Sequence, residues 1–136
     1  MAKQEIQIIK SKEIFYRGKT MEELKTLDVR EFAKYLKSTP RRFVLRNFNV
    51  IEKFLKVCDK KLARGKKIKT HLRDIVIVPK MVGMLIAVYT GRTFQEITIT
   101  GEMLGHKLGE FAHTRGRVNH GSAGLGATKS SRAMKK

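Results

Sequence analysis

Acidic residues are scarce in this sequence. Among 136 residues, 12 are Asp or Glu and 30 are Lys or Arg, which gives a formal net charge of +18. Like charges at this density repel one another in a compact chain, so the excess favours an anionic partner that neutralises it. Nucleic acid is the first candidate for that partner, and an anionic membrane surface is the second.

Long apolar runs are also missing. A membrane-spanning helix needs roughly 18 consecutive apolar residues, whereas the longest apolar stretches here, 75–78 and 81–88, are short and interrupted. The N-terminal sequence MAKQEIQIIKSKE carries charges where a signal peptide has its apolar segment. We therefore expect a cytoplasmic protein with no membrane partner.

Cysteine is almost absent, because Cys58 is the only one. A single cysteine excludes an intramolecular disulfide and a Cys-rich zinc site. Glu102, His106 and Glu110 could share one face of a continuous helix, but the two glycines within that stretch argue against such a helix. We expect neither a metal site nor a cofactor.

Recognisable catalytic patterns are lacking as well. No nucleophile, base and orienting acid form a set, and neither a phosphate-binding loop of the Walker type nor a dinucleotide-binding loop occurs. We therefore expect no enzymatic activity and no small-molecule substrate. An enzyme remains only a third hypothesis, which ligand-induced stabilisation of the fold would test.

Aromatic residues are few and do not form the paired platform of an RNA-recognition sheet. Recognition of an anionic partner should therefore depend on charge and shape rather than on base stacking. Six aromatic residues have apolar neighbours that suit a core: Phe32, Tyr35, Phe43, Phe48, Phe54 and Phe111.

Capping signals and an apolar stripe predict helices in the first 64 residues. A capping residue followed three positions later by Glu is typical of a helix start, and it occurs three times: Thr20 with Glu23, Asp28 with Glu31, and Asn49 with Glu52. The third helix is the clearest, since an apolar stripe repeats at helical spacing and stops before Gly65. The stripe consists of Ile51, Phe54, Leu55, Cys58 and Leu62, so Cys58 is predicted to be a small core residue.

The middle of the chain predicts strands. The segments 74–78, 84–89 and 94–100 are short, rich in β-branched or aromatic residues, and bounded by Gly or Pro. Thr90 and Gly91 between the second and third segments predict an antiparallel hairpin. The fold class is then α+β, with N-terminal helices packed on a small three-stranded sheet that contains this hairpin.

The end of the chain differs from the rest. Residues 114–136 hold six Lys or Arg, several Gly, Ser and Thr, and neither an acidic nor an aromatic residue. Such a segment cannot bury enough apolar surface to fold alone. We expect one globular domain at 1–113, with an N-terminal helical extension, and a flexible basic tail at 114–136.

Two clusters of cations are candidate phosphate-binding surfaces, because acidic residues hardly interrupt them. The denser one lies where the third helix gives way to the first predicted strand, and the other precedes that helix. Their members are Lys60, Lys61, Arg64, Lys66, Lys67, Lys69 and Arg73 in the first, and Arg41, Arg42 and Arg46 in the second.

Three segments then resemble a known family. Pro79-Lys-Met-Val-Gly83, Ile86-Ala-Val-Tyr-Thr-Gly-Arg92 and Gly105-His-Lys-Leu-Gly-Glu-Phe111 are similar to the S-nineteen family of small-subunit ribosomal proteins. The resemblance extends over nearly the whole chain. Phe15-Tyr-Arg-Gly18 and the tail segment 120–132 resemble archaeal and eukaryotic members rather than the shorter bacterial ones, whereas the ending 133–136 lacks the proline of many relatives.

The resemblance implies a structural protein of the small ribosomal subunit. It would bind rRNA in the head of the subunit beside ribosomal protein S-thirteen, and its C-terminal tail would extend toward the decoding region and tRNA. Together with the charge pattern, it gives the expected rRNA-binding residues Arg41, Arg42, Arg46, Lys66, Lys67, Lys69, Arg73, Arg92, His106 and Lys107. The expected tail contacts to RNA or tRNA are Arg115, Arg117, His120, Lys129 and Arg132.

A different class of protein shares the same charge and tail. A small basic DNA-compacting protein would also carry a large positive excess, because phosphate contacts are largely independent of sequence. It would bind duplex DNA and rRNA with comparable affinity. Competition between the two nucleic acids separates these hypotheses.

Overall fold

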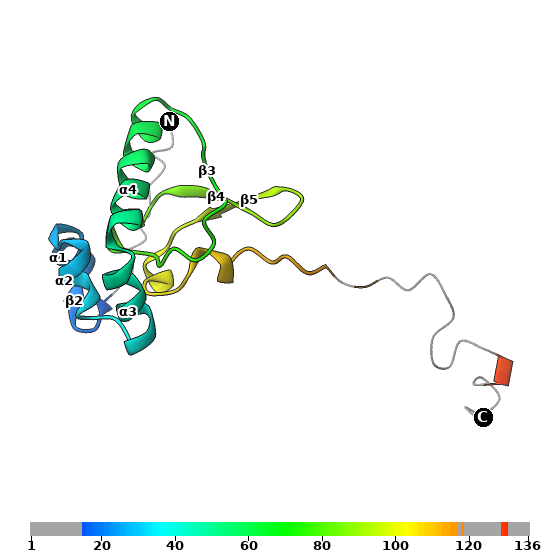
Figure 1. Cartoon of the computed structure of the whole chain (residues 1–136), viewed down its shortest axis with the longest axis horizontal. Coiled ribbons are helices and arrows are strands. Elements are labelled where there is room, and N and C mark those ends of the chain that lie inside the picture. The colour runs from blue at the N-terminus through cyan, green and yellow to red at the C-terminus, as the bar shows by residue number, and fades with distance from the viewer. Residues whose placement is uncertain (1–14, 117, 119–128, 131–136) are drawn as a thin grey trace, which may run out of the picture.

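The computed structural model describes residues 15–116, 118, 129 and 130. Helices lie on one side of a small sheet, and residues 113–116 leave this body as an extended segment (Figure 1). The helices are α1 (Met21–Thr26), α2 (Val29–Ala33), α3 (Ser38–Arg46) and α4 (Phe48–Ala63), and the strands are β1 (Phe15–Tyr16), β2 (Lys19–Thr20), β3 (Ile68–Thr70), β4 (Leu85–Tyr89) and β5 (Phe94–Thr98). The α+β prediction is confirmed.

The two short helices begin where the capping signals placed them. The Thr20 hydroxyl accepts a hydrogen bond from the backbone N–H of Glu23 at 3.4 Å, and α1 follows it. Asp28 precedes α2, and its backbone N–H donates to the Glu31 carboxylate at 3.2 Å. Both arrangements occupy backbone amides that a helix start leaves free.

Helix α4 carries the apolar stripe to the core. Ile51, Phe54, Leu55 and Cys58 are buried, whereas Leu62 at the last turn is 48% exposed. Each fully buried aliphatic or aromatic side chain contributes roughly 1.5–3 kcal/mol, so the stripe holds α4 against the sheet. Burial, as the main cause, raises the pKa of the Cys58 thiol to about 11, which keeps it in the protonated, unreactive form.

Helix α4 ends just before Gly65, as the sequence predicted. Gly65 adopts φ = 61°, and its N–H donates to the Leu62 carbonyl at 2.9 Å. The N–H of Lys66 reaches back to the Lys61 carbonyl, also at 2.9 Å. This pair of bonds is a Schellman motif, and it turns the chain sharply from α4 into β3.

One helix start was predicted at the wrong residue, and one helix was missed. α4 starts at Phe48, so Asn49 lies inside the helix rather than at its N-cap. α3 was not predicted at all, because it has no side-chain cap and its first turn includes Pro40. Proline is compatible with the first turn of a helix, where the backbone N–H has no partner in any case.

The three-stranded sheet has the order β3-β4-β5. β4 and β5 form the predicted antiparallel hairpin, with Tyr89 opposite Phe94 at its end. β3 pairs with β4 in parallel, with Lys69 opposite Ala87. Alternation along the strands places Ile68, Ile86 and Ile97 toward the core. The other face carries the exposed Lys69 and Glu96, with the buried Ala87 between them.

The prediction of a strand at 74–78 was wrong. These residues are buried from Ile75 to Val78, but only Val76 forms a bridge, with Lys107. Their backbone groups are satisfied by the segment 105–109 instead: the N–H of Ile77 donates to the His106 carbonyl at 2.8 Å, and the N–H of Leu108 donates to the Ile75 carbonyl at 3.0 Å. The apolar run reflected complete burial, which periodicity cannot distinguish from a strand.

Candidate nucleic-acid interface

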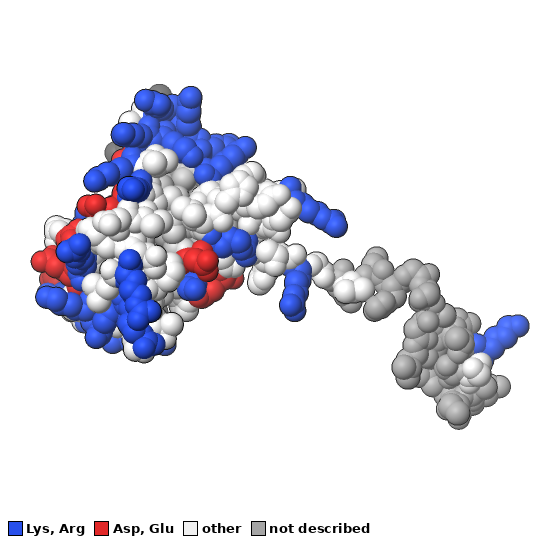
Figure 2. All heavy atoms as spheres, viewed as in Figure 1, with Lys and Arg blue, Asp and Glu red and all other residues white. Residues whose placement is uncertain are grey.

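Positive side chains gather over the C-terminal end of α4 and the turn that follows it, at the top of the view in Figure 2. A second group lies over the N-terminal helices, with acidic side chains between the two. In the first group Lys60, Arg64 and Lys66 are exposed, and none of the three forms an ion pair with an acid within the described residues. Asp59 is the sole acidic residue from position 53 to position 73.

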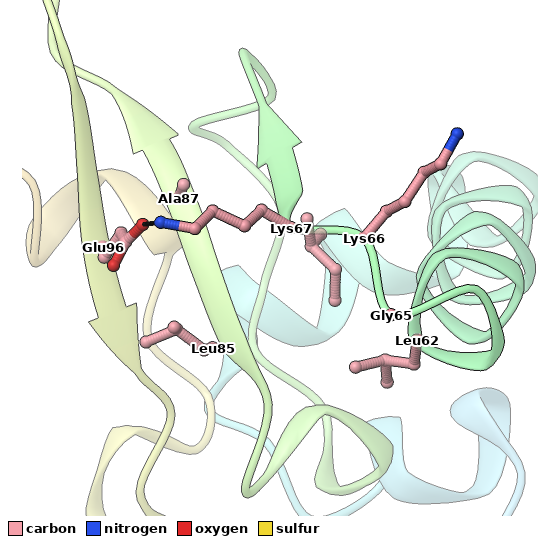
Figure 3. Close-up of a pocket in the computed structure, with 8 residues that line it drawn as sticks. Leu62, Gly65, Lys66, Lys67, Leu85, Ala87 and Glu96 are labelled. Atoms are coloured by element: carbon pink, nitrogen blue, oxygen red, sulfur yellow. Dashed lines mark hydrogen bonds and ion pairs between the residues drawn. The ribbon is translucent and has the colours of Figure 1, made fainter.

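Lys66 and Lys67 are neighbours in sequence but differ in direction (Figure 3). Lys67 extends across Ala87 on the open face of the sheet, and its Nζ lies 2.7 Å from the Glu96 carboxylate. That hydrogen bond and the charge of Glu96 raise the pKa of Lys67. Lys66 points away from this pair and from the small cavity of about 250 Å³ beside it, so Lys66 offers its full charge to solvent.

Arg73 is held inside the fold. Its guanidinium donates to three backbone carbonyls, those of Tyr89 at 2.6 Å, Gly109 at 3.0 Å and Ala112 at 2.5 Å. These acceptors lie at the end of β4 and in the last part of the globular body. Sequence reasoning expected Arg73 to bind RNA, which stays a prediction; the structure shows three of its N–H groups bonded within the fold.

Arg41 has a similar internal role. Its Nε donates to the Ala33 carbonyl at 3.2 Å, and its Nη2 donates to the carbonyls of Lys34 at 2.8 Å and Leu36 at 3.0 Å. These are carbonyls at and beyond the C-terminus of α2, where a cation is favourable. All three arginines of the second cluster are exposed, but within the described residues only Arg41 uses its guanidinium on backbone carbonyls.

His106 and Lys107 are both paired with acids. His106 Nδ1 lies 2.6 Å from the Glu110 carboxylate, and Lys107 Nζ lies 3.5 Å from that of Asp74. Burial opposes ionisation of Glu110, but hydrogen bonds from His106 and from the Lys107 backbone N–H lower the pKa of the carboxyl below its usual value. Among the described residues, no three His, Cys, Asp or Glu side chains come together as a possible metal site.

The remaining expected contacts lie on the sheet and in the tail. Arg92 is exposed in the loop between β4 and β5, and Lys69 is exposed on β3. In the tail, Arg115 and Lys129 are exposed. Arg117, His120 and Arg132 lie outside the described residues.

Sequence reasoning missed Lys53. It lies on α4 two turns before Lys61, and both line a groove between α4 and residues 69–72 together with Lys69. Their spacing of eight residues places them on one face of a helix, so helical periodicity of charge could have identified Lys53. The basic surface is therefore longer than the sequence cluster.

The chain matches the family model described as Ribosomal protein S19 over residues 37–120, a span that includes α3, α4, the whole sheet and the segment 105–112. The chain belongs to the ribosomal protein S19 family. Two relatives are both named small ribosomal subunit protein uS19. One, from Methanocella arvoryzae, is 45% identical over 132 residues, which cover 96% of this chain and 93% of the relative. The other, from Saccharolobus solfataricus, is 44% identical over 120 residues, which cover 85% of this chain and 86% of the relative.

Family membership confirms the resemblance drawn from the segments 79–83, 86–92 and 105–111. All three lie inside the matched region. In the structure, residues 105–109 hydrogen-bond to residues 73–77, and the N–H of Gly83 donates to the Ile99 carbonyl at 2.9 Å. Within the described residues, no helix combines the length and the apolar character needed to cross a membrane.

Proposed function

We propose that this protein is a structural component of the small ribosomal subunit and binds rRNA in the subunit head. The names of its relatives describe proteins of that subunit, and the similarity covers most of both chains, which supports the same place for this one in cytoplasmic ribosomes. The observation that carries the proposal is the group of cations at the end of α4, on a fold of this family. We call Lys60, Lys61, Arg64, Lys66 and Lys69 the α4-end cluster.

The α4-end cluster suits a phosphate backbone rather than a small ligand. The described part of the chain offers its cations on a convex helix end and an adjoining turn, where several phosphates can approach at once (Figure 2). Folded RNA presents phosphates at irregular positions, so charge placement and shape select the site. Lysines act as point charges there, and arginines can grip a phosphate with two donors.

Outside the α4-end cluster, further exposed cations are present on α3, at Arg42 and Arg46, and in the hairpin loop, at Arg92. Arg73 and Arg41 act differently in the proposal, because their donors hold backbone carbonyls. They shape the surface rather than bind phosphate. His106 and Lys107 would reach RNA only as parts of their pairs with Glu110 and Asp74.

The finer proposals concern neighbours. By its family, the chain would contact ribosomal protein S-thirteen, and the segment 114–136 would run along RNA toward the decoding region and tRNA. The exposed Arg115 and Lys129 and the lack of acidic residues in this segment support such a path. Ordering a chain costs conformational entropy, which phosphate contacts would offset.

Replacing Lys60, Arg64 and Lys66 together by Ala should weaken binding to small-subunit head rRNA by at least about tenfold near 0.1 M salt. Each lost phosphate contact removes about 0.7–0.9 from the slope of log affinity against log salt, so the slope should fall by about 2–3. Binding titrations at several salt concentrations measure both quantities.

The matched control replaces Lys25, Lys34 and Lys80 by Ala. These three are exposed cations outside both clusters, and the net charge falls by the same amount. An equal loss in both triple variants would mean that charge acts without regard to position. Duplex DNA is the competitor in the same titration, and equal affinity for DNA and rRNA would favour a DNA-compacting protein instead.

A chain that ends at residue 113 should keep the thermal unfolding temperature of the whole chain, because residues 114–116 are exposed. It should lose part of the salt dependence of rRNA binding, since six cations are removed. Calorimetry and the same titration test the two statements. Unfolding at a clearly lower temperature would show that the tail belongs to the folded domain.

A further inference from the structure

Three aromatic rings meet at one end of the open face of the sheet. Tyr89 ends β4 and Phe94 begins β5, and the two lie opposite each other with ring centroids 5.1 Å apart. His71 follows β3 directly, and its ring centroid lies 4.5 Å from that of Tyr89 and 5.2 Å from that of Phe94. Segments that are distant in sequence thus build one aromatic cluster.

The cluster is open to solvent and flanked by cations. His71 is exposed, and Tyr89 and Phe94 are half-buried. Lys69 Nζ lies 5.3 Å from the centroid of the Phe94 ring, and the exposed Arg92 belongs to the loop that joins the two strands. Positive charge therefore borders the rings on the strand side and on the loop side.

The geometry of the cluster is fixed before any ligand arrives. The Tyr89 hydroxyl donates to the Gly91 carbonyl at 2.6 Å, which anchors its ring against the hairpin loop. Glu96, the acidic residue on the same face of β5, forms an ion pair with Lys67, whose Nζ lies 2.7 Å from the carboxylate. The face thus presents rigid rings and positive charge to an approaching ligand.

His71 also borders open space. It lines the groove of about 450 Å³ between α4 and residues 69–72, together with Lys53 and Lys61. A cross-strand pair of Tyr89 and Phe94 would by itself stabilise the hairpin. An exposed third ring and flanking cations are not needed for that purpose.

We propose that His71, Tyr89 and Phe94 form a stacking site for an unpaired base of RNA, with Lys69 and Arg92 on the phosphates beside it. Flat rings with flanking cations match the chemistry of an unstacked nucleotide, which offers a π-face and a negative charge. The inference rests on the proposed binding of RNA and adds a contact that charge alone does not provide.

The test uses the whole chain and two short single-stranded RNAs, one of oligoadenylate and one of the same length without bases. His71→Ala should lower affinity for oligoadenylate about tenfold and leave affinity for the baseless strand unchanged. The salt slope should stay the same, because stacking on a base neutralises no phosphate and so releases no counterion. His71→Phe should retain the affinity of the unchanged chain, since it keeps a ring.

Two further variants separate this site from the general binding of RNA. Lys69→Ala should lower both affinity and salt slope for both strands. Phe15→Ala removes a ring that is 60% exposed on β1, a strand of the separate two-stranded sheet, and should change neither. Thermal unfolding of His71→Ala should match the unchanged chain, because His71 is exposed.

The stacking site would be overturned if His71→Ala lost equal affinity for the two RNA strands, or if it lost no affinity at all. If the Lys60, Arg64 and Lys66 variant still loses affinity for rRNA, the proposed function stands without it. If that variant also binds rRNA normally, the proposed function fails as well. If His71→Ala still binds RNA and a protein binds in the groove beside His71, the groove belongs to a protein partner.

Discussion

Replacing Arg73 by Ala is expected to lower the free energy of unfolding by about 3 kcal/mol or more. The guanidinium donates to the carbonyls of Tyr89, Gly109 and Ala112, and a hydrogen bond to a charged group contributes roughly 1.5–3 kcal/mol. The full sum is not expected, because water can reach a half-buried site and replace part of the loss. Urea unfolding measures the change.

Two comparisons sharpen the Arg73 experiment. Arg73→Lys keeps the charge but cannot span three carbonyls, so it should lose most of the same stability. Arg92→Ala removes an exposed arginine from the loop and should stay within about 0.5 kcal/mol of the unchanged chain. A stable Arg73→Ala variant that has lost affinity for rRNA would return Arg73 to the interface.

Gly105→Ala should also destabilise the fold by about 3 kcal/mol. Gly105 has φ = 80°, a conformation that costs an L-residue about 1–2 kcal/mol. A Cβ there would lie 2.9 Å from the Tyr16 hydroxyl oxygen and 3.0 Å from Leu36 Cδ2, and such overpacking typically costs about 1–3 kcal/mol. Thermal or urea unfolding gives the total.

The two causes can be separated at other positions. Gly65 also has positive φ, at 61°, but nothing lies within 4 Å of a Cβ built there. Gly65→Ala should therefore show the backbone cost alone, about 1–2 kcal/mol. Tyr16→Phe removes the nearer clashing atom, so adding it to Gly105→Ala should recover part of the loss. Equal effects of the two glycine variants would contradict the steric explanation.

Local signals predicted the N-terminal helices well because they depend on neighbouring residues. Thr20 and Asp28 cap helices that follow at once, and Gly65 ends α4 through bonds to residues within five positions. α3 was missed because no such signal precedes it. The run 75–78 was assigned to a strand because burial on both sides, rather than pairing in the sheet, makes it apolar.

The cation assignments show a different limit. Composition identifies Arg41, Arg73 and Lys66 equally as positive side chains, yet the first two donate to backbone carbonyls and the third is free in solvent. The carbonyl partners of Arg73 lie 16 to 39 residues away. No pattern of spacing reveals a partner at that separation.

The sequence by itself determined the class of partner and the family. Net charge is a sum over residues and needs no structure, and the family signature is a string that includes Gly105 to Phe111. Only the tertiary structure decided which cations are free in solvent and which aromatic rings come together. His71, Tyr89 and Phe94 are separated along the chain and come together because β3 pairs with β4 in parallel and β4 pairs with β5 across a hairpin. The pairing of strands depends on burial of the whole core. Local sequence patterns therefore cannot predict an aromatic surface that is built from the ends of three strands.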